Sequence, residues 1–207
     1  MAANIIDRVR GLPDTVLVNM NEVKIAFWPP SGPTRVLATE GLNGCTGVGI
    51  ISRHAGILAH IAPLPPVETW SGLTDPGKQN LILKLQAVIN LYNTYRHYFP
   101  QAESFVVIAY HLGSVANAEA DRVVRAVLGR LGLSITTRLY NVLEAGTDRA
   151  SGRTAIVIVA AVQGVMPVVE DETGSLSEFA RNALRTYPIE PHFKTVFKQT
   201  ARNLVIT

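Results

Sequence analysis

A single cysteine, Cys45, and the histidine His60 are the side chains of this sequence best suited to nucleophilic chemistry. Gly44 and Gly47 lie close to the cysteine, and their lack of side chains leaves backbone N–H groups free to bind a substrate carbonyl, as an oxyanion hole requires. A free thiol has a pKa of about 8.5, so it needs a neighbouring imidazole to take its proton. The same imidazole can later protonate a leaving amine. In isolation a lone cysteine is more often a small buried hydrophobe, so the hypothesis depends on where His60 lies.

The spacing of Cys45 and His60 matches a β-hairpin. Two apolar runs, at 45–52 and 56–61, flank a short polar connection and predict its two strands. With the pairing axis in Ser52-Arg53, residues whose numbers sum to 105 face each other, which places Cys45 directly opposite His60. Opposed residues have Cβ atoms about 4.5–5.5 Å apart on the same face, whereas a slip of one residue would put them on opposite faces. The hairpin therefore predicts that the thiol and the imidazole share a proton.

A third group usually orients such an imidazole, and Thr39, at the end of the preceding predicted strand, is the candidate. The segment Gly41–Gly49 is not a phosphate-binding loop, because it has no lysine in the required place. One cysteine and dispersed histidines also lack the spacing of zinc ligands, so no metal site is expected. The other histidines are more simply read as solvated or structural; they are His54, His97, His111 and His192.

The elements that must hold these residues read as strands first, followed by mixed helix and strand. Asp75-Pro76 is a typical helix start and Asn117 begins a second helix, which Gly132 closes. Further strands are predicted at 15–20, 22–28, 35–39, 104–110, 133–140 and 154–162, and further helices from 175 and at 192–205. The run at 154–162 is apolar throughout and is expected to be central in its sheet. This order predicts an α+β fold with a C-terminal helical extension.

Composition fits one domain with an appended tail. The chain has 207 residues, of which 47% are hydrophobic and 17% charged, which argues against disorder. The net charge of +3 is scattered without a basic stripe, so no nucleic-acid partner is expected. One cysteine excludes an intrachain disulfide. The segment Met1 to Arg10 has no apolar run of signal-peptide length, and no stretch of the chain reaches the ~18 apolar residues that span a bilayer. We therefore expect a cytoplasmic protein without membrane insertion.

Motifs around the predicted site resemble a known family. The segments are Thr39-Glu40-Gly41-Leu42-Asn43-Gly44-Cys45-Thr46-Gly47-Val48-Gly49-Ile50 and Ile57-Leu58-Ala59-His60-Ile61-Ala62-Pro63-Leu64-Pro65. Together they resemble the CheD family of chemoreceptor glutamine deamidases, and the spacing from Thr39 to Cys45 is similar to that of the family. Weaker similarity continues through Asn117-Ala118-Glu119-Ala120, Leu131-Gly132-Leu133-Ser134-Ile135 and Ser151-Gly152-Arg153-Thr154.

The resemblance implies a layered α/β sandwich, shared with the catalytic domain of cytotoxic necrotizing factor toxins, in which mixed, mostly antiparallel strands pack against two helices. It implies a deamidase domain over 1–172, although the strands within 1–34 have no clear counterpart, and a helical extension over 173–207. It also implies a reaction in which Cys45 attacks a glutamine carboxamide, ammonia leaves, and water resolves the thioester to glutamate. His60 would be the base and then the acid, Thr39 would hold His60, and no cofactor would take part.

Alternative interpretations stay open. A protein that presents an exposed glutamine is the partner that the resemblance implies, but an amine could resolve the same thioester, which would make the chain a transglutaminase, or the pair could hydrolyse another amide. The chain could also be a binding module that keeps the fold without turnover. The tail carries Lys194, Lys198 and Arg202 along one expected helix, which could dock a partner or simply pack with a solvated face.

Overall fold

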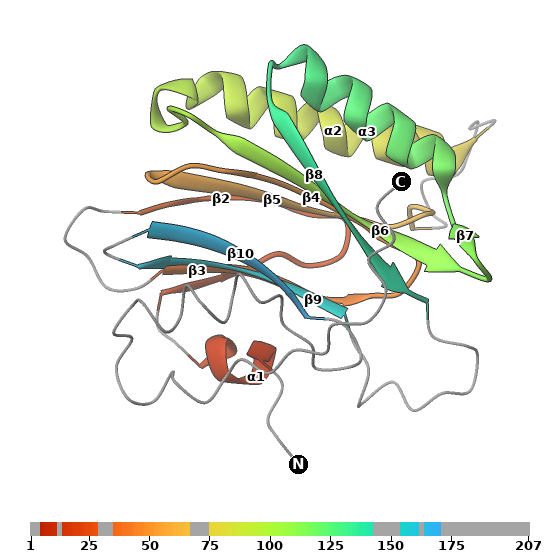
Figure 1. The fold of residues 1–207 in the computed structure, drawn as a ribbon, viewed down its shortest axis with the longest axis horizontal. Helices are drawn as coiled ribbons and strands as arrows, with labels where there is room; N and C mark the ends of the chain where they lie inside the picture. Colours follow the sequence, from red (N-terminus) through yellow and green to blue (C-terminus); the bar gives the residue numbers. More distant parts are fainter. Residues whose placement is uncertain are drawn as a thin grey trace.

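The computed structural model describes residues 5–11, 14–28, 35–66, 75–142, 154–161 and 164–170. In these ranges two β-sheets are stacked face to face, and two long helices cover the outer face of one of them (Figure 1). The strands are mixed and mostly antiparallel, so the predicted α+β sandwich with two packed helices is confirmed. The helices expected after residue 172 lie outside the described residues, and the domain boundary stays a prediction.

The larger sheet, here called sheet B, carries both predicted strands of the hairpin. Its strand order is β2-β5-β4-β6-β7, with β8 beside β6. The strands are β2 (Val23–Phe27), β4 (Thr46–Ile51), β5 (Ala55–Ile61), β6 (Glu103–His111), β7 (Ser114–Val115) and β8 (Ser134–Asn141). Pairing is antiparallel except between β6 and β8, which are parallel and are joined through a helix, as parallel neighbours require.

The smaller sheet, sheet A, has the order β1-β3-β9-β10. Its strands are β1 (Thr15–Leu17), β3 (Arg35–Leu42), β9 (Thr154–Ala161) and β10 (Gly164–Glu170). The apolar strand β9 lies between two neighbours, as its sequence predicts. The sequence did not predict β10, nor the short helix α1 (Ile5–Arg10), which lies on the outer side of sheet A in Figure 1.

The two long helices begin where their capping residues predict. Helix α2 (Pro76–Thr94) follows Asp75, whose carboxylate accepts the Lys78 N–H at 2.9 Å, and ends before the short 3-10 helix η2 (Arg96–Tyr98). Helix α3 (Ala118–Arg130) follows Asn117, whose side chain accepts the Ala120 N–H at 2.9 Å. No helix within the described ranges has both the length and the apolar character needed to cross a membrane.

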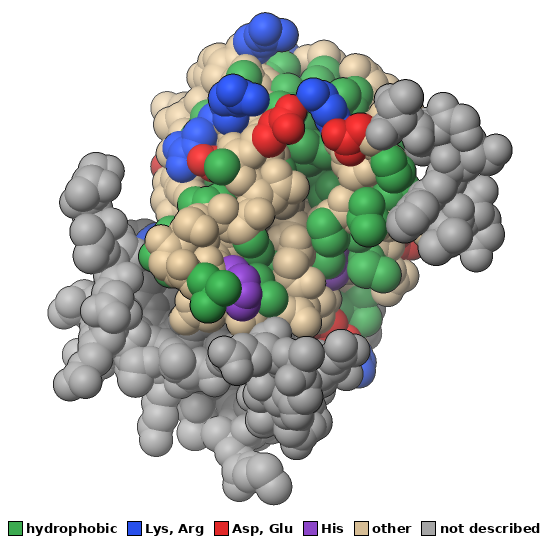
Figure 2. Space-filling model, turned by 90° about the vertical axis from the view of Figure 1, so that its right-hand side faces the viewer, with side chains coloured by type: hydrophobic (Ala, Val, Ile, Leu, Met, Phe, Trp, Pro, Cys, Tyr) green, Lys and Arg blue, Asp and Glu red, His purple; other side chains and the backbone are tan. Residues whose placement is uncertain are grey.

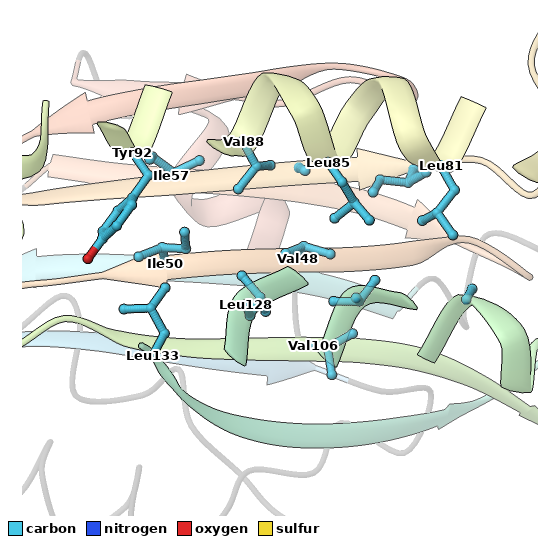
Figure 3. Packing of buried hydrophobic residues seen from close by; sticks show 14 of the residues in the cluster. Val48, Ile50, Ile57, Leu81, Leu85, Val88, Tyr92, Val106, Leu128 and Leu133 are labelled. Carbon is cyan, nitrogen blue, oxygen red and sulfur yellow. The ribbon is translucent and has the colours of Figure 1, made fainter. Parts of the chain in front are cut away.

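Sheet B separates two buried clusters because successive side chains of a strand point to opposite faces. The helix-facing cluster joins Val48, Ile50 and Ile57 of the sheet to Leu85 and Val88 of α2 (Figure 3). The second cluster fills the space between the sheets, where Leu58 and Val107 of sheet B meet Leu37, Ile156 and Ile158 of sheet A. Cys45 belongs to this intersheet cluster.

Candidate active site

His60 lies between the two sheets and is held there by a chain of hydrogen bonds. It projects from β5, and its Nδ1 lies 2.7 Å from Thr39 Oγ1 on β3. Thr39 Oγ1 in turn donates its single proton to the carbonyl of Val18, at 2.7 Å. With that proton committed, the threonine oxygen can only accept a hydrogen bond from the imidazole. The geometry therefore assigns the His60 tautomer with the proton on Nδ1 and a lone pair on Nε2.

The other ring nitrogen of His60 is left without a partner. The Nε2 atom is buried and makes no hydrogen bond within the described residues, although His60 is only 2% exposed. An orphaned buried acceptor costs about 1–3 kcal/mol, and such atoms are rare in folded proteins. Within the described residues Arg35 Nε is also buried without a partner. Burial lowers the pKa of His60 to about 4. At neutral pH the ring is therefore uncharged and presents a free basic nitrogen.

Cys45 shares a face with His60 but is not directly opposite it. Strands β4 and β5 pair Gly47 with His60 and Thr46 with Ile61, so paired residue numbers sum to 107 and the predicted register of 105 is wrong. The error is two residues, which preserves the face because strand side chains alternate with period two. Extending the ladder one residue beyond β4 sets Cys45 diagonal to His60, where Cβ atoms are typically about 7–8 Å apart or somewhat less. No hydrogen bond joins the two within the described part of the chain.

The hairpin turn explains the difference in register. Ser52 N–H donates to the carbonyl of Ala55 at 2.9 Å, so the loop between the paired strands is Arg53-His54. The Ser52 hydroxyl oxygen accepts the N–H groups of His54 and Ala55 at 3.1 and 3.2 Å. A serine that binds the backbone of its own turn stabilises that turn over its neighbours in sequence. The pairing axis consequently lies one residue later than predicted.

The Cys45 thiol sits in an apolar environment. The residue is 4% exposed and packs within the intersheet cluster. Burial raises the pKa of the Cys45 thiol, and a backbone hydrogen bond from Asn43 opposes this effect only in part. With imidazole and thiol both neutral in the free protein, thiolate formation requires a proton transfer that accompanies attack on a substrate.

Tyr140 is a residue at the site that sequence reasoning missed. Its hydroxyl, which projects from β8, donates to the backbone carbonyl of Cys45 at 2.7 Å. Burial is the main cause that raises the pKa of Tyr140, so the hydroxyl stays protonated and keeps its role as a donor. The sequence places Tyr140 at the end of a predicted strand, and this position alone does not indicate which residue its hydroxyl would contact.

Two glycines near Cys45 serve different purposes. Gly44 has a φ of +84°, a left-handed conformation that other residues rarely adopt, so it shapes the turn just before Cys45. Gly47 allows close packing between the sheets, because a Cβ there would lie 2.2 Å from Cδ1 of Ile156. The glycine-rich segment thus combines an unusual torsion at Gly44 with a close approach at Gly47.

Cys45 lies at one end of the sandwich. Because β4 is antiparallel to β6, Cys45, which precedes β4, lies at the end where β6 finishes. Figure 2 views this end, and the charged side chains visible there gather mainly along its upper edge, while the centre is largely apolar or uncharged.

The described histidines other than His60 take no part in the hydrogen-bonded chain of Thr39 and His60. His54 is in the hairpin turn, His97 is exposed in η2, and His111 is exposed at the end of β6, while His192 lies outside the described residues. Within the described ranges no group of three histidine, cysteine, aspartate or glutamate side chains is placed to hold a metal ion.

Comparison with known proteins does not assign the chain to a family. No model of a known protein family matches the chain, and no curated protein is significantly similar to it in sequence. The resemblance to the CheD family stays a prediction that rests on its motifs.

Proposed function

We propose that this chain is a protein glutamine deamidase of the CheD type, which converts an exposed glutamine of a partner protein to glutamate. Cys45 acts as the nucleophile, His60 as general base and then acid, and Thr39 as the residue that orients His60. The observation that carries the proposal is the buried, unpartnered Nε2 of His60, whose lone pair is fixed by the Thr39 hydrogen bond on the other side of the ring.

The chemistry follows from these positions. As the Cys45 sulfur bonds to the glutamine carboxamide carbon, the thiol proton moves to His60 Nε2. The protonated imidazole then gives its proton to the amide nitrogen, the carbon–nitrogen bond breaks, and ammonia leaves. Water attacks the resulting thioester while His60 takes a proton from it, and the proton returns to sulfur as the carbon–sulfur bond breaks. The products are glutamate and the free thiol.

Mass spectrometry of a treated lysate tests the proposal. Lysate incubated with wild-type protein should gain Gln-to-Glu changes and ammonia, and lysate incubated with Cys45→Ala should gain neither. Circular dichroism checks that the variant is folded. Wild-type rates in the folded Cys45→Ala protein would exclude the mechanism, and incorporation of a labelled primary amine would instead indicate transglutamination.

The burial of Cys45 favours a second candidate, a CheD-like binding module without turnover. Its raised thiol pKa is what a structural cysteine would show. Alkylation by iodoacetamide separates the two candidates, because a deamidase has a base beside the sulfur. Faster alkylation of wild type than of His60→Gln supports the deamidase, whereas equal, slow alkylation supports the binding module.

A further inference from the structure

The backbone around His60 departs from a regular ladder. Strands β2 and β5 pair regularly from Val23, opposite Ala59, onward. Beyond that point Asn21 and Glu22 together lie opposite His60. The His60 N–H donates to the carbonyl of Glu22 at 3.0 Å, and the His60 carbonyl accepts the N–H of Asn21 at 2.7 Å. Asn21 has a φ of 63°, the left-handed conformation of the first residue in one type of β-bulge. Bulges of this kind re-aim side chains and occur next to active sites.

The side chain of Asn21 extends this contact past His60. Its Oδ1 accepts the N–H of Ala62 at 3.1 Å and a hydrogen bond from Asn80 Nδ2 at 2.8 Å. The same Asn80 nitrogen donates to the Ala62 carbonyl at 3.0 Å, and Asn80 is buried in α2. His60 is thus held by its own N–H and carbonyl, while Ala62, two residues later, is tied to both asparagines.

The same turn also supplies the far end of the imidazole chain. Val18, whose carbonyl accepts the Thr39 hydroxyl proton, lies three residues before Asn21. A close turn joins the two, because Glu22 N–H donates to the carbonyl of Asn19 at 3.0 Å. One segment therefore sets both the backbone of His60 and the group that fixes its tautomer.

We infer that Asn21 is a positioning residue for His60, and that through Asn80 it ties the geometry of the imidazole to helix α2. The inference deepens the proposed function, on which it rests for its catalytic meaning. Asn21 bonds to the backbone of His60 and Ala62 and to Asn80, and none of these hydrogen bonds involves the thiol or the ring. It acts by fixing where β5 carries His60, so its loss should let the ring leave the Thr39 hydrogen bond.

Nuclear magnetic resonance of the free protein tests this inference without relying on turnover. Nitrogen shifts of His60 should report a single tautomer protonated on Nδ1 in wild type. Asn21→Gly keeps the left-handed backbone and the N–H to His60 but removes Oδ1, and it should give a mixture of both tautomers. Asn21→Asp keeps an acceptor oxygen and should restore the wild-type spectrum. If folded Asn21→Gly retains the single tautomer, the inference is wrong.

Controls separate positioning from general stability. Gln101 is exposed and has a φ of 53°, so Gln101→Gly makes the same backbone change away from the site and should leave the tautomer unchanged. A tautomer change in Gln101→Gly as large as in Asn21→Gly would overturn the inference. If Asn21→Gly does not fold, Asn80→Ala decides the question, because it removes the donor to Asn21 Oδ1 and should also mix the tautomers. An unchanged tautomer in folded Asn80→Ala would then be the contrary result.

Turnover gives a second, independent readout. With casein as the glutamine-bearing probe, Asn21→Gly should lower kcat about 10- to 100-fold with little change in KM, because the base is misplaced and binding is not. An equal fall of kcat in Asn21→Gly and Gln101→Gly would contradict a positioning role for Asn21. If wild type releases no ammonia from any substrate, the proposed function fails, while the tautomer comparison still decides whether Asn21 positions His60.

Discussion

The two faces of sheet B bury side chains of different kinds. Toward the helices, the described cluster is made of apolar and aromatic residues such as Val48, Leu85 and Val88, which pack without directional bonds. Toward sheet A, the intersheet space also holds Thr39 and His60 in a hydrogen-bonded chain that crosses from one sheet to the other. Apolar packing is stable in many slightly different geometries, because dispersion and burial are not directional. The hydrogen-bonded chain requires one geometry, because each bond needs its donor and acceptor at a set distance and angle.

If the proposed function holds, the two faces divide the work, with packing on one and chemistry on the other. The apolar part of the helix-covered face should tolerate changes that preserve volume, because its packing depends on no single hydrogen bond. Asn80 of α2 is the exception, since its side chain donates to Asn21 Oδ1. On the intersheet face a small shift breaks a hydrogen bond or moves the free nitrogen of His60. Substitutions on the two faces should therefore separate effects on folding from effects on the site.

Leu85→Ala on the helix-facing side should have the largest effect on stability. Leu85 is buried between α2 and sheet B, and its truncation leaves a cavity that should lower the free energy of unfolding by about 2–5 kcal/mol. Urea denaturation measures the loss. The matched control Ile82→Ala, on the same helix but 50% exposed, should change stability by about 0.5 kcal/mol or less. Slower alkylation of Cys45 in folded Leu85→Ala would contradict the separation of the two faces.

Acid should destabilise the intersheet face through His60. Burial lowers the pKa of His60 from 6.5 to about 4, so between these values the unfolded chain binds a proton that the folded chain does not. Stability is therefore complete above pH ~6.5 and falls as the pH drops toward ~4, by about 3 kcal/mol in total. Urea denaturation at intervals across this range measures the slope. His60→Gln should remove this part of the dependence, and an equal slope in that variant would show that other groups cause it.

Gly47→Ala tests the close approach of the two sheets. The new methyl group would meet Cδ1 of Ile156, and the crowding should cost about 1–3 kcal/mol. Ile156→Val removes that atom, so the double variant should recover much of the loss, which a double-mutant cycle measures as coupling. Gly129→Ala in α3 has open space around it and should instead be neutral or stabilise by up to about 1 kcal/mol. Absence of coupling would contradict the predicted contact.

Tyr140→Phe should have the smallest effect on stability but a specific effect on the thiol. It removes the hydrogen bond to the Cys45 carbonyl, worth about 1 kcal/mol, and frees the backbone that carries the sulfur. The rate of Cys45 alkylation by iodoacetamide should change. Tyr92→Phe, in the helix-facing cluster, is the matched control and should leave the rate unchanged. The same rate in all three proteins would show that Tyr140 does not constrain Cys45.

The features of the fold that the sequence predicts correctly depend on local interactions. The helix starts at Asp75 and Asn117 depend on a side chain that binds a backbone N–H three residues later, and this contact can be read from spacing alone. Strand alternation likewise places Cys45 and His60 on one face in either register. The strands β7 and β10 and helix α1 carry too little pattern to predict, since they are short or pair at an edge.

The chain on its own specifies the thiol, the imidazole, the threonine and the face that they share, because these follow from residue type and from periodicity over a few residues. Tertiary structure decides the rest. Ser52 sets the register, Tyr140 reaches Cys45 across 95 residues of sequence, and the stacking of two sheets brings Thr39 to His60. Such contacts depend on packing between distant segments, and no local pattern of residues encodes their geometry.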